Sequence, residues 1–269
     1  MGPRSGPFLF VYLFMHSKVN ILGVNVSSIY NKDLTKIFIS IIKEKRFSQV
    51  AITPVNSILS AYTDASILEM YNKAEFVLCD GMPIKWASHF FCTSIKERIT
   101  GLDLLPKIVS LAHEEKFSLF LLGASPGVAD KLAEVIKERF PNAKIAGIYV
   151  PPFMKVFSEE ENRKMVDAVN ASNADIVLVS LTAPKQDIWI AQNKYILNPA
   201  LYVGIGGAFE VMAGLAKRAP KWMQASGLEW LYRFIQEPKR LFRRYFIEAP
   251  VFIPLVIRQK FGWLKSPIN

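Results

Sequence analysis

The residue whose type and position most clearly suggest chemistry is Asp80, a carboxylate that directly follows the short apolar run Phe76–Cys79. A run of this length is typical of a buried strand, and Pro83 forbids further strand pairing. The pattern therefore predicts a carboxylate at the carboxyl end of a parallel strand, where open α/β sheets build their sites. Arg98 and Thr100 follow in a loop that we expect to reach the same crevice. The alternative is an ordinary Asp-Gly turn beside a surface arginine.

Small and neutral polar residues follow the other apolar runs of the chain. They are Thr53, Asn56, Gly123, Gly127, Gln186, Gly206 and Gly207. Glycines let backbone N–H groups approach a phosphate with a helix N-terminus behind it, and Thr, Asn and Gln can hydrogen-bond a sugar or a base. Each has an ordinary alternative: the glycines as tight turns, Asn56 as a helix N-cap and Gln186 as a solvated helix residue. Their coincidence at predicted strand ends favours a site.

The sequence lacks the motifs that identify several classes of nucleotide-binding and metal-binding protein. The pair Gly204-x-Gly206 lacks the third glycine of the dinucleotide-binding fingerprint and lies late in the chain. The sequence contains no Gly-Lys-Ser/Thr of a P-loop and no Asp-x-Asp, the usual clamp for a metal-bound nucleotide sugar. Its two cysteines and three histidines are scattered, so they suggest no metal site. We therefore expect no metal and no cofactor, with cations and helix ends holding a phosphate leaving group.

The formal net charge of +10 is concentrated near the C-terminus. From Lys217 onward there are 11 Lys and Arg against 3 Asp and Glu, whereas residues 1–216 hold 22 basic and 20 acidic residues. Such asymmetry predicts phosphate, nucleic acid or an anionic membrane surface as the partner of this region. No stretch of the sequence reaches the roughly 18 apolar residues of a spanning helix.

Hydrophobic and basic residues interleave at helical spacing in this basic region. With Trp and Phe on the apolar side, the pattern indicates an amphipathic helix that lies on a membrane surface. Arg233 and Arg240 are seven residues apart and would share a face of a continuous helix, although we expect Pro238 to break it into two pieces. The apolar content is too high for a solvated arm that binds nucleic acid. The alternative is a terminal helix packed on the body, with solvated arginines.

Strand and helix patterns alternate through the rest of the chain. The predicted strands are Val19–Val26, Val50–Thr53, Phe76–Cys79, Ser118–Leu122, Lys144–Val150, Asp175–Leu181 and Ala200–Ile205, and predicted helices include Asp33–Lys45, Ser57–Asn72, Leu104–Glu115, one that Ser125 caps, one that Ser158 and Glu161 cap, and Pro184–Tyr195. This alternation predicts an α/β fold with a doubly wound, mostly parallel sheet. We divide the chain into a leader (1–17), an α/β core (18–215) and a basic amphipathic appendage (216–269). The sparse cysteines fit a reducing cytoplasm.

An ordered set of motifs runs along the chain. They are Thr53-x-x-Asn56, Asp80-Gly-Met-Pro-x-x-Trp86, Glu97-Arg98-x-Thr100-Gly-x-Asp103, Leu122-Gly-Ala-x-Pro-Gly127, Pro184-Lys-Gln186, Gly204-x-Gly-x-Ala-Phe209, Gly214, Lys217-Arg-Ala-Pro220 and Leu228-Glu-Trp-Leu-Tyr-Arg233. This combination resembles the WecG/TagA/CpsF family of bacterial glycosyltransferases. The resemblance implies a Rossmann-like fold of the GT-E type and an inverting, metal-independent transferase. Such enzymes move N-acetylmannosamine or a related hexose from a UDP-sugar donor to a polyprenyl-diphosphate-linked acceptor, at the cytoplasmic face of the cell membrane, in the synthesis of surface polysaccharides such as teichoic acid.

The resemblance also implies roles for individual residues. The family's proposed general base corresponds to Asp80. Its other site residues correspond to Thr53, Asn56, Arg98 and Gln186, and the appendage arginines proposed to stabilise the leaving diphosphate correspond to Arg233, Arg240 and Arg243. One departure is that many members have asparagine two residues after the threonine, whereas here Val55 intervenes. The chemistry agrees, since a carboxylate can deprotonate an attacking hydroxyl and forked guanidiniums suit a diphosphate.

Two other classes of function are carried as alternatives. A nucleotide-binding oxidoreductase would bind NAD(P) tightly, and a non-catalytic membrane scaffold would bind anionic vesicles but release no UDP. The sequence does not determine the donor hexose, the acceptor, the pathway, or whether the chain forms a homo-oligomer.

Overall fold

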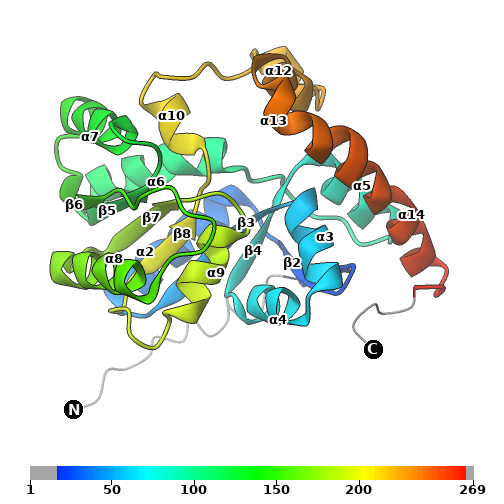
Figure 1. Cartoon of the computed structure of the whole chain (residues 1–269), viewed down its shortest axis with the longest axis horizontal. Helices are drawn as coiled ribbons and strands as arrows, with labels where there is room; N and C mark the ends of the chain where they lie inside the picture. The colour runs from blue at the N-terminus through cyan, green and yellow to red at the C-terminus, as the bar shows by residue number, and fades with distance from the viewer. Residues whose placement is uncertain (1–16, 265–269) are drawn as a thin grey trace.

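The computed structural model describes residues 17–264, apart from the side chains of Ala225 and Arg240. The predicted leader, except Ser17, therefore lies outside the described residues. The central strands are β3 (Ser48–Pro54), β4 (Phe76–Asp80), β5 (Ser118–Gly123), β6 (Lys144–Tyr149), β7 (Ile176–Ser180) and β8 (Leu201–Gly204). They form one six-stranded sheet in the order β4-β3-β8-β7-β5-β6, and every neighbouring pair is parallel (Figure 1). The predicted α/β class with a parallel sheet is confirmed.

Helices cover both faces of this sheet. They are α2 (Asn31–Lys43), α3 (Val55–Thr63), α4 (Ala65–Lys73), α5 (Met82–Phe90), α6 (Gly101–Glu115), α7 (Val128–Arg139), α8 (Glu159–Ser172), α9 (Lys185–Gln192) and α10 (Ala208–Met212). Successive residues of β4 join opposite cores: Phe76 and Leu78 pack with α2, α6 and α7, whereas Val77 and Cys79 pack with α3, α4 and α5. Because both faces of the central strands are buried, these strands are mostly apolar, which is why short apolar runs predicted them.

A separate two-stranded antiparallel sheet precedes the main one. It consists of β1 (Ser17–Ile21) and β2 (Val24–Ser28). The prediction of one continuous strand over Val19–Val26 is wrong. Leu22 and Gly23 have φ angles of 51° and 91°, so the chain reverses between the two strands in a left-handed turn.

The region between β3 and β4 also differs from its prediction. A single helix over Ser57–Asn72 is wrong, because α3 and α4 are separated at Asp64. The Asp64 carboxylate accepts hydrogen bonds from the backbone N–H of Ser66 at 2.8 Å and of Ile67 at 3.3 Å, which is the geometry of a helix N-cap. The sequence interpretation also missed α5, which follows β4.

Of the two other predicted caps, one is right. Ser158 caps α8, since its Oγ accepts from the backbone N–H of Glu161 at 3.2 Å. Ser125 does not cap α7, because Gly127 occupies the N-cap position with no side-chain hydrogen bond.

The predicted appendage is described over residues 216–264, called here the C-terminal segment. It contains α11 (Lys221–Ala225), α12 (Glu229–Gln236), α13 (Pro238–Phe242), the π-helix η1 (Arg243–Glu248) and α14 (Ala249–Lys260). The predicted break at Pro238 is confirmed. Figure 1 shows α12, α13 and α14 following one another past the edge of the molecule that carries α3 and α5. No helix within residues 17–264 is long and apolar enough to cross a membrane.

The far end of the C-terminal segment is anchored to the core. Phe252 and Val256 of α14 are buried in the same apolar cluster as residues of α3 and β1. The side chain of Gln259 accepts a hydrogen bond from the backbone N–H of Leu22 at 2.8 Å. The far end of the C-terminal segment is thus packed on the core.

Candidate active site

Asp80 ends β4 at the carboxyl edge of the sheet, opposite Pro54 of β3. Gly81 follows with a φ of 120°, a conformation that residues with a side chain rarely adopt. The chain therefore leaves the strand at once and enters α5. This sharp exit holds the partly buried carboxyl of Asp80 at the strand end, as the sequence predicts.

The loop that carries Arg98 packs against the same strand end. The backbone N–H of Ile99 donates to the carbonyl of Cys79 at 3.0 Å, so Arg98 stands next to the end of β4. Its side chain is only 16% exposed. Thr100 then caps α6 by accepting from the backbone N–H of Asp103 at 3.2 Å. These contacts hold the C-terminal end of the loop, which places a largely buried guanidinium at the Asp80 site.

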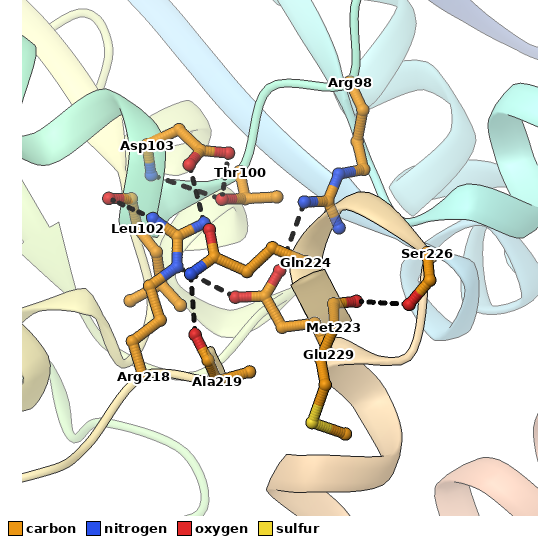
Figure 2. Close-up of polar contacts among 10 residues, drawn as sticks. All are labelled: Arg98, Thr100, Leu102, Asp103, Arg218, Ala219, Met223, Gln224, Ser226 and Glu229. Carbon is orange, nitrogen blue, oxygen red and sulfur yellow. Dashed lines mark hydrogen bonds and ion pairs between the residues drawn. The ribbon is translucent and has the colours of Figure 1, made fainter. Parts of the chain in front are cut away.

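A chain of ion pairs joins this loop to the C-terminal segment (Figure 2). Glu229, the first residue of α12, accepts from Arg98 Nη2 at 3.1 Å and from Arg218 Nε at 2.9 Å. Arg218 Nη2 in turn donates to Asp103 Oδ1 at 2.6 Å. The hydroxyl of Thr100 donates to the other oxygen of Asp103 at 2.8 Å. Glu229 and Arg218 lie within the sequence motifs, but the sequence assigns them no role. Their partners in the core, Arg98 and Asp103, are more than 100 positions away in the chain.

Opposing influences act on the pKa of Asp80. Burial raises it, the guanidiniums of Arg244, Arg233 and Arg98 lower it in that order, and the carboxylate of Glu229 raises it. Burial prevails, so the pKa of Asp80 stands above its ordinary value. A carboxylate with a raised pKa is a better proton acceptor near neutral pH. The surrounding arginines come from the core loop, from α12 and from η1.

The predicted arginines of the C-terminal segment have different surroundings. Arg233 lies near the loop after β8, since its Nη2 is 3.8 Å from where a Cβ on Gly207 would stand. Arg243 is 80% exposed and pairs with Glu248 at 3.1 Å. Its neighbour Arg244, which the sequence interpretation did not select, is the half-buried one that acts on Asp80. The side chain of Arg240 lies outside the described part of the structure.

Gln186 is a buried residue, which corrects the alternative of a solvated helix position. It is 1% exposed, and its Oε1 accepts from the backbone N–H of Gly206 at 3.0 Å. A Cβ on Gly204 would lie 2.6 Å from Asp187 Oδ1 and 2.7 Å from Gln186 Nε2, so any larger residue there would require these two buried side chains to move. Gln186 therefore supports the loop after β8 through its side chain. Its Oε1 is engaged in the hydrogen bond with the backbone N–H of Gly206.

Hydrogen bonds also tie the neighbouring strand ends together. Ser180 Oγ donates to the carbonyl of Gly206 at 2.6 Å, and the backbone N–H of Ala124 donates to the carbonyl of Ser180 at 2.8 Å. A Cβ on Gly123 would stand 2.6 Å from that same carbonyl oxygen. In contrast, the space beside Gly127 is open, with no atom within 4 Å of a Cβ position. The loop after β5 thus has one packed end and one accessible end.

Thr53 lies in β3 next to the end of β4, and Asn56 follows three residues later in α3. Thr53 pairs with Cys79 in the strand register and is fully buried. Asn56 lies in the first turn of α3, and the alternative that it caps this helix is wrong, since Pro54 occupies that position without a side-chain bond. The Oδ1 of Asn56 is buried and has no hydrogen-bond partner among the described residues. An orphaned buried acceptor is a feature that a bound hydroxyl or N–H group would satisfy.

The site therefore combines the Asp80 carboxylate, several guanidiniums with the Glu229 carboxylate that pairs with one of them, and glycine-rich backbone. Within residues 17–264, no group of three or more His, Cys, Asp or Glu is placed to hold a metal ion. Such a constellation can accept a proton and stabilise a phosphate in the same crevice.

Comparisons with known proteins point in the same direction. Residues 19–266 match the model described as the glycosyl transferase WecG/TagA/CpsF family. The chain is 31% identical over 189 residues to the "N-acetylglucosaminyldiphosphoundecaprenol N-acetyl-beta-D-mannosaminyltransferase" of Bacillus spizizenii, covering 70% of each chain. It is 27% identical over 246 residues to the protein of the same name from Staphylococcus aureus strain MW2, covering 91% of this chain and 94% of that one.

Proposed function

The chain belongs to the WecG/TagA/CpsF family of glycosyltransferases, and on that premise we propose that it transfers N-acetylmannosamine from a UDP-sugar to undecaprenyl-diphosphate-linked N-acetylglucosamine. The names of the relatives support this choice of sugar and acceptor. The observation that carries the proposed mechanism is the place of Asp80, which faces arginines from two separate parts of the chain.

Asp80 is the proposed general base. The acceptor hydroxyl loses its proton to the Asp80 carboxylate as its oxygen attacks the anomeric carbon of the donor. The bond from that carbon to the diphosphate breaks, UDP departs, and the configuration at the anomeric carbon inverts. A base must be ionised to act, so activity falls as the pH drops through the raised pKa of Asp80.

Arg98, Arg233 and Arg244 are the proposed partners of the departing diphosphate. Negative charge grows on the β-phosphate as the bond breaks, and preorganised guanidiniums stabilise it more in the transition state than in the ground state. Backbone near Gly127 and Gly207 would supply neutral donors to the phosphates. Asn56 would hydrogen-bond a sugar hydroxyl through its orphaned oxygen.

The C-terminal segment is the proposed contact with an anionic membrane surface at the cytoplasmic face. Its exposed large apolar side chains are Trp222, Trp230, Ile235, Phe242, Phe246, Ile247, Val251, Ile253, Ile257, Phe261 and Trp263. Exposed aromatic and aliphatic side chains interleaved with basic residues are the pattern of an interfacial segment. It would bring the arginines of the segment to the diphosphate of a membrane-bound acceptor.

UDP release tests this function. The full chain is incubated with UDP-N-acetylmannosamine and a short-chain lipid diphosphate carrying N-acetylglucosamine, in solution and in anionic vesicles, beside a panel of other UDP-sugars. We expect acceptor-dependent UDP release, with a vesicle rate that falls as salt screens the basic segment. UDP release with a different UDP-sugar alone would show that the chain uses another donor. No release with any of the donors would refute the proposed function.

A further inference from the structure

We propose that Glu229 is a positioning residue that locks α12 onto the core and holds Arg98 in place at the Asp80 site. The inference deepens the proposed function and rests on it for its catalytic consequence. Its structural half, the docking of α12, stands on contacts alone.

Glu229 is the only buried residue of α12, a helix whose side chains are all described. It is 7% exposed, whereas Trp230 and Ile235 of the same helix are 40% and 68% exposed. Leu231, Tyr232 and Phe234 are half-buried, but none of them belongs to the apolar core clusters, so core packing alone does not account for the position of this helix. What remains is the pair of charge-assisted hydrogen bonds from Arg98 and Arg218 to the Glu229 carboxylate, which are stronger than bonds between neutral groups.

The turn that leads into α12 presses directly on the Asp80 strand exit. Gly227 has a φ of 78°, and a Cβ there would stand 3.1 Å from Cγ of Met82, the first residue after Gly81. A movement of α12 away from the core would therefore also change the packing around Met82, two residues after Asp80.

Glu229 and Arg233 stand one helical turn apart, on the same face of α12. Glu229 bonds the core loop through Arg98, and Arg233 reaches the strand end at Gly207. The docking of Glu229 thus decides whether Arg233 reaches its place, in addition to orienting Arg98. Removing one partner of such a buried pair leaves the other charge uncompensated.

The test compares Glu229→Gln with Glu248→Gln, a matched change in the same segment at a carboxylate whose partner, Arg243, is 80% exposed. Hydrogen–deuterium exchange of the full-length protein reports docking without any substrate. We expect faster exchange of the amides of α12 and of residues 96–100 in Glu229→Gln only. If Glu229→Gln fails to fold, the same exchange measurement is made on Arg218→Gln, which removes the other guanidinium bonded to the Glu229 carboxylate.

Kinetics of UDP release test the catalytic half. Misplacement of catalytic groups by about 1 Å lowers turnover about a hundredfold, so we expect a loss of that order in kcat for Glu229→Gln, with a much smaller change in the KM of the UDP-sugar. In a double-mutant cycle with Arg98→Ala the two losses should be strongly non-additive, because Glu229 acts through Arg98. Unchanged exchange of α12 overturns the docking. Changed exchange with normal kcat, or additive losses, overturns the positioning role. A wild-type protein that releases no UDP would refute the proposed function and leave the exchange result standing.

Discussion

The two halves of the carboxyl edge of the sheet are built in different ways. At β5, β7 and β8 the strand ends are neutral and joined to one another, through Ser180, Gly206 and Gln186. At β4 the edge is charged, and arginines from outside the sheet complete it. The first half is held by hydrogen bonds within the core, and Arg233 of α12 reaches it only at Gly207, in the loop after β8. The second depends on how the C-terminal segment docks, so the two halves should respond differently to substitution.

The largest expected effect is at the charged half. Asp80→Asn keeps the shape of the side chain but removes the proposed base, so kcat should fall about a hundredfold or more, while the fold and UDP-sugar binding are kept. Steady-state UDP release and titration calorimetry with the UDP-sugar measure the two quantities. Asp130→Asn, an exposed carboxylate in the first turn of α7, is the control. Near-normal turnover of Asp80→Asn would remove the residue from this role.

The next effect separates two adjacent arginines. Arg244→Ala should lower kcat by about tenfold or more, because it removes a guanidinium from the charged half. A positive charge favours the carboxylate form, so its loss raises the pKa of Asp80 further. The acid limb of the pH–rate profile should accordingly move to higher pH.

Arg243→Ala is the matched control for that prediction, one position earlier on the same π-helix. Its exposed ion pair with Glu248 contributes little, and we expect a rate and a pH profile close to those of the unsubstituted chain. The reverse pattern, with Arg243 essential and Arg244 dispensable, would contradict the arrangement of η1 described above.

A smaller effect on rate, with a clear effect on stability, is expected at the neutral half. Gln186→Leu leaves the part-buried N–H of Gly206 without its acceptor, which should lower the free energy of unfolding by about 1–3 kcal/mol. Thermal and denaturant unfolding measure it, with Gln192→Leu, an exposed glutamine on the same helix, as the control. If Gln186→Leu unfolds normally but loses UDP-sugar binding, the residue contacts the donor instead of shaping the loop.

The smallest expected effect is that of metal removal. The proposed site uses guanidiniums and backbone where other transferases use a metal, so UDP release should be unchanged after treatment with EDTA. A loss of activity that added Mg²⁺ or Mn²⁺ restores would show that the charged half needs a cation besides its arginines.

Much of the framework could be predicted from local patterns. The apolar runs located the parallel strands, because strands buried on both faces leave no polar positions. Asp80 at its strand end followed from one such run and the Gly and Pro after it. The cap at Ser158 and the break at Pro238 were likewise readable from short-range chemistry. Where local signals conflicted, as in the turn at Leu22 and the break at Asp64, the prediction failed.

The register of the C-terminal arginines was not readable in this way. The expectation for Arg243 came from the family resemblance alone, and that for Arg240 also from its seven-residue spacing to Arg233; in the structure residues 243–248 form a π-helix. A turn of this kind holds more residues than an α-helical turn, so it changes which neighbour faces inward. Arg244 acts on Asp80 as a result, and Arg243 points to solvent.

The sequence by itself therefore determined the sheet, the strand-end position of Asp80 and the basic, amphipathic character of the C-terminal segment, because each depends on residues within a few positions of one another. Only the tertiary structure decided that Gln186 is buried beneath a loop, that Arg244 acts on Asp80, and that Glu229 bridges Arg98 and Arg218. The Arg98–Glu229 bond joins residues 131 positions apart. Such pairings depend on how whole segments pack, since a side chain finds its partner in space only after the backbone has brought both together.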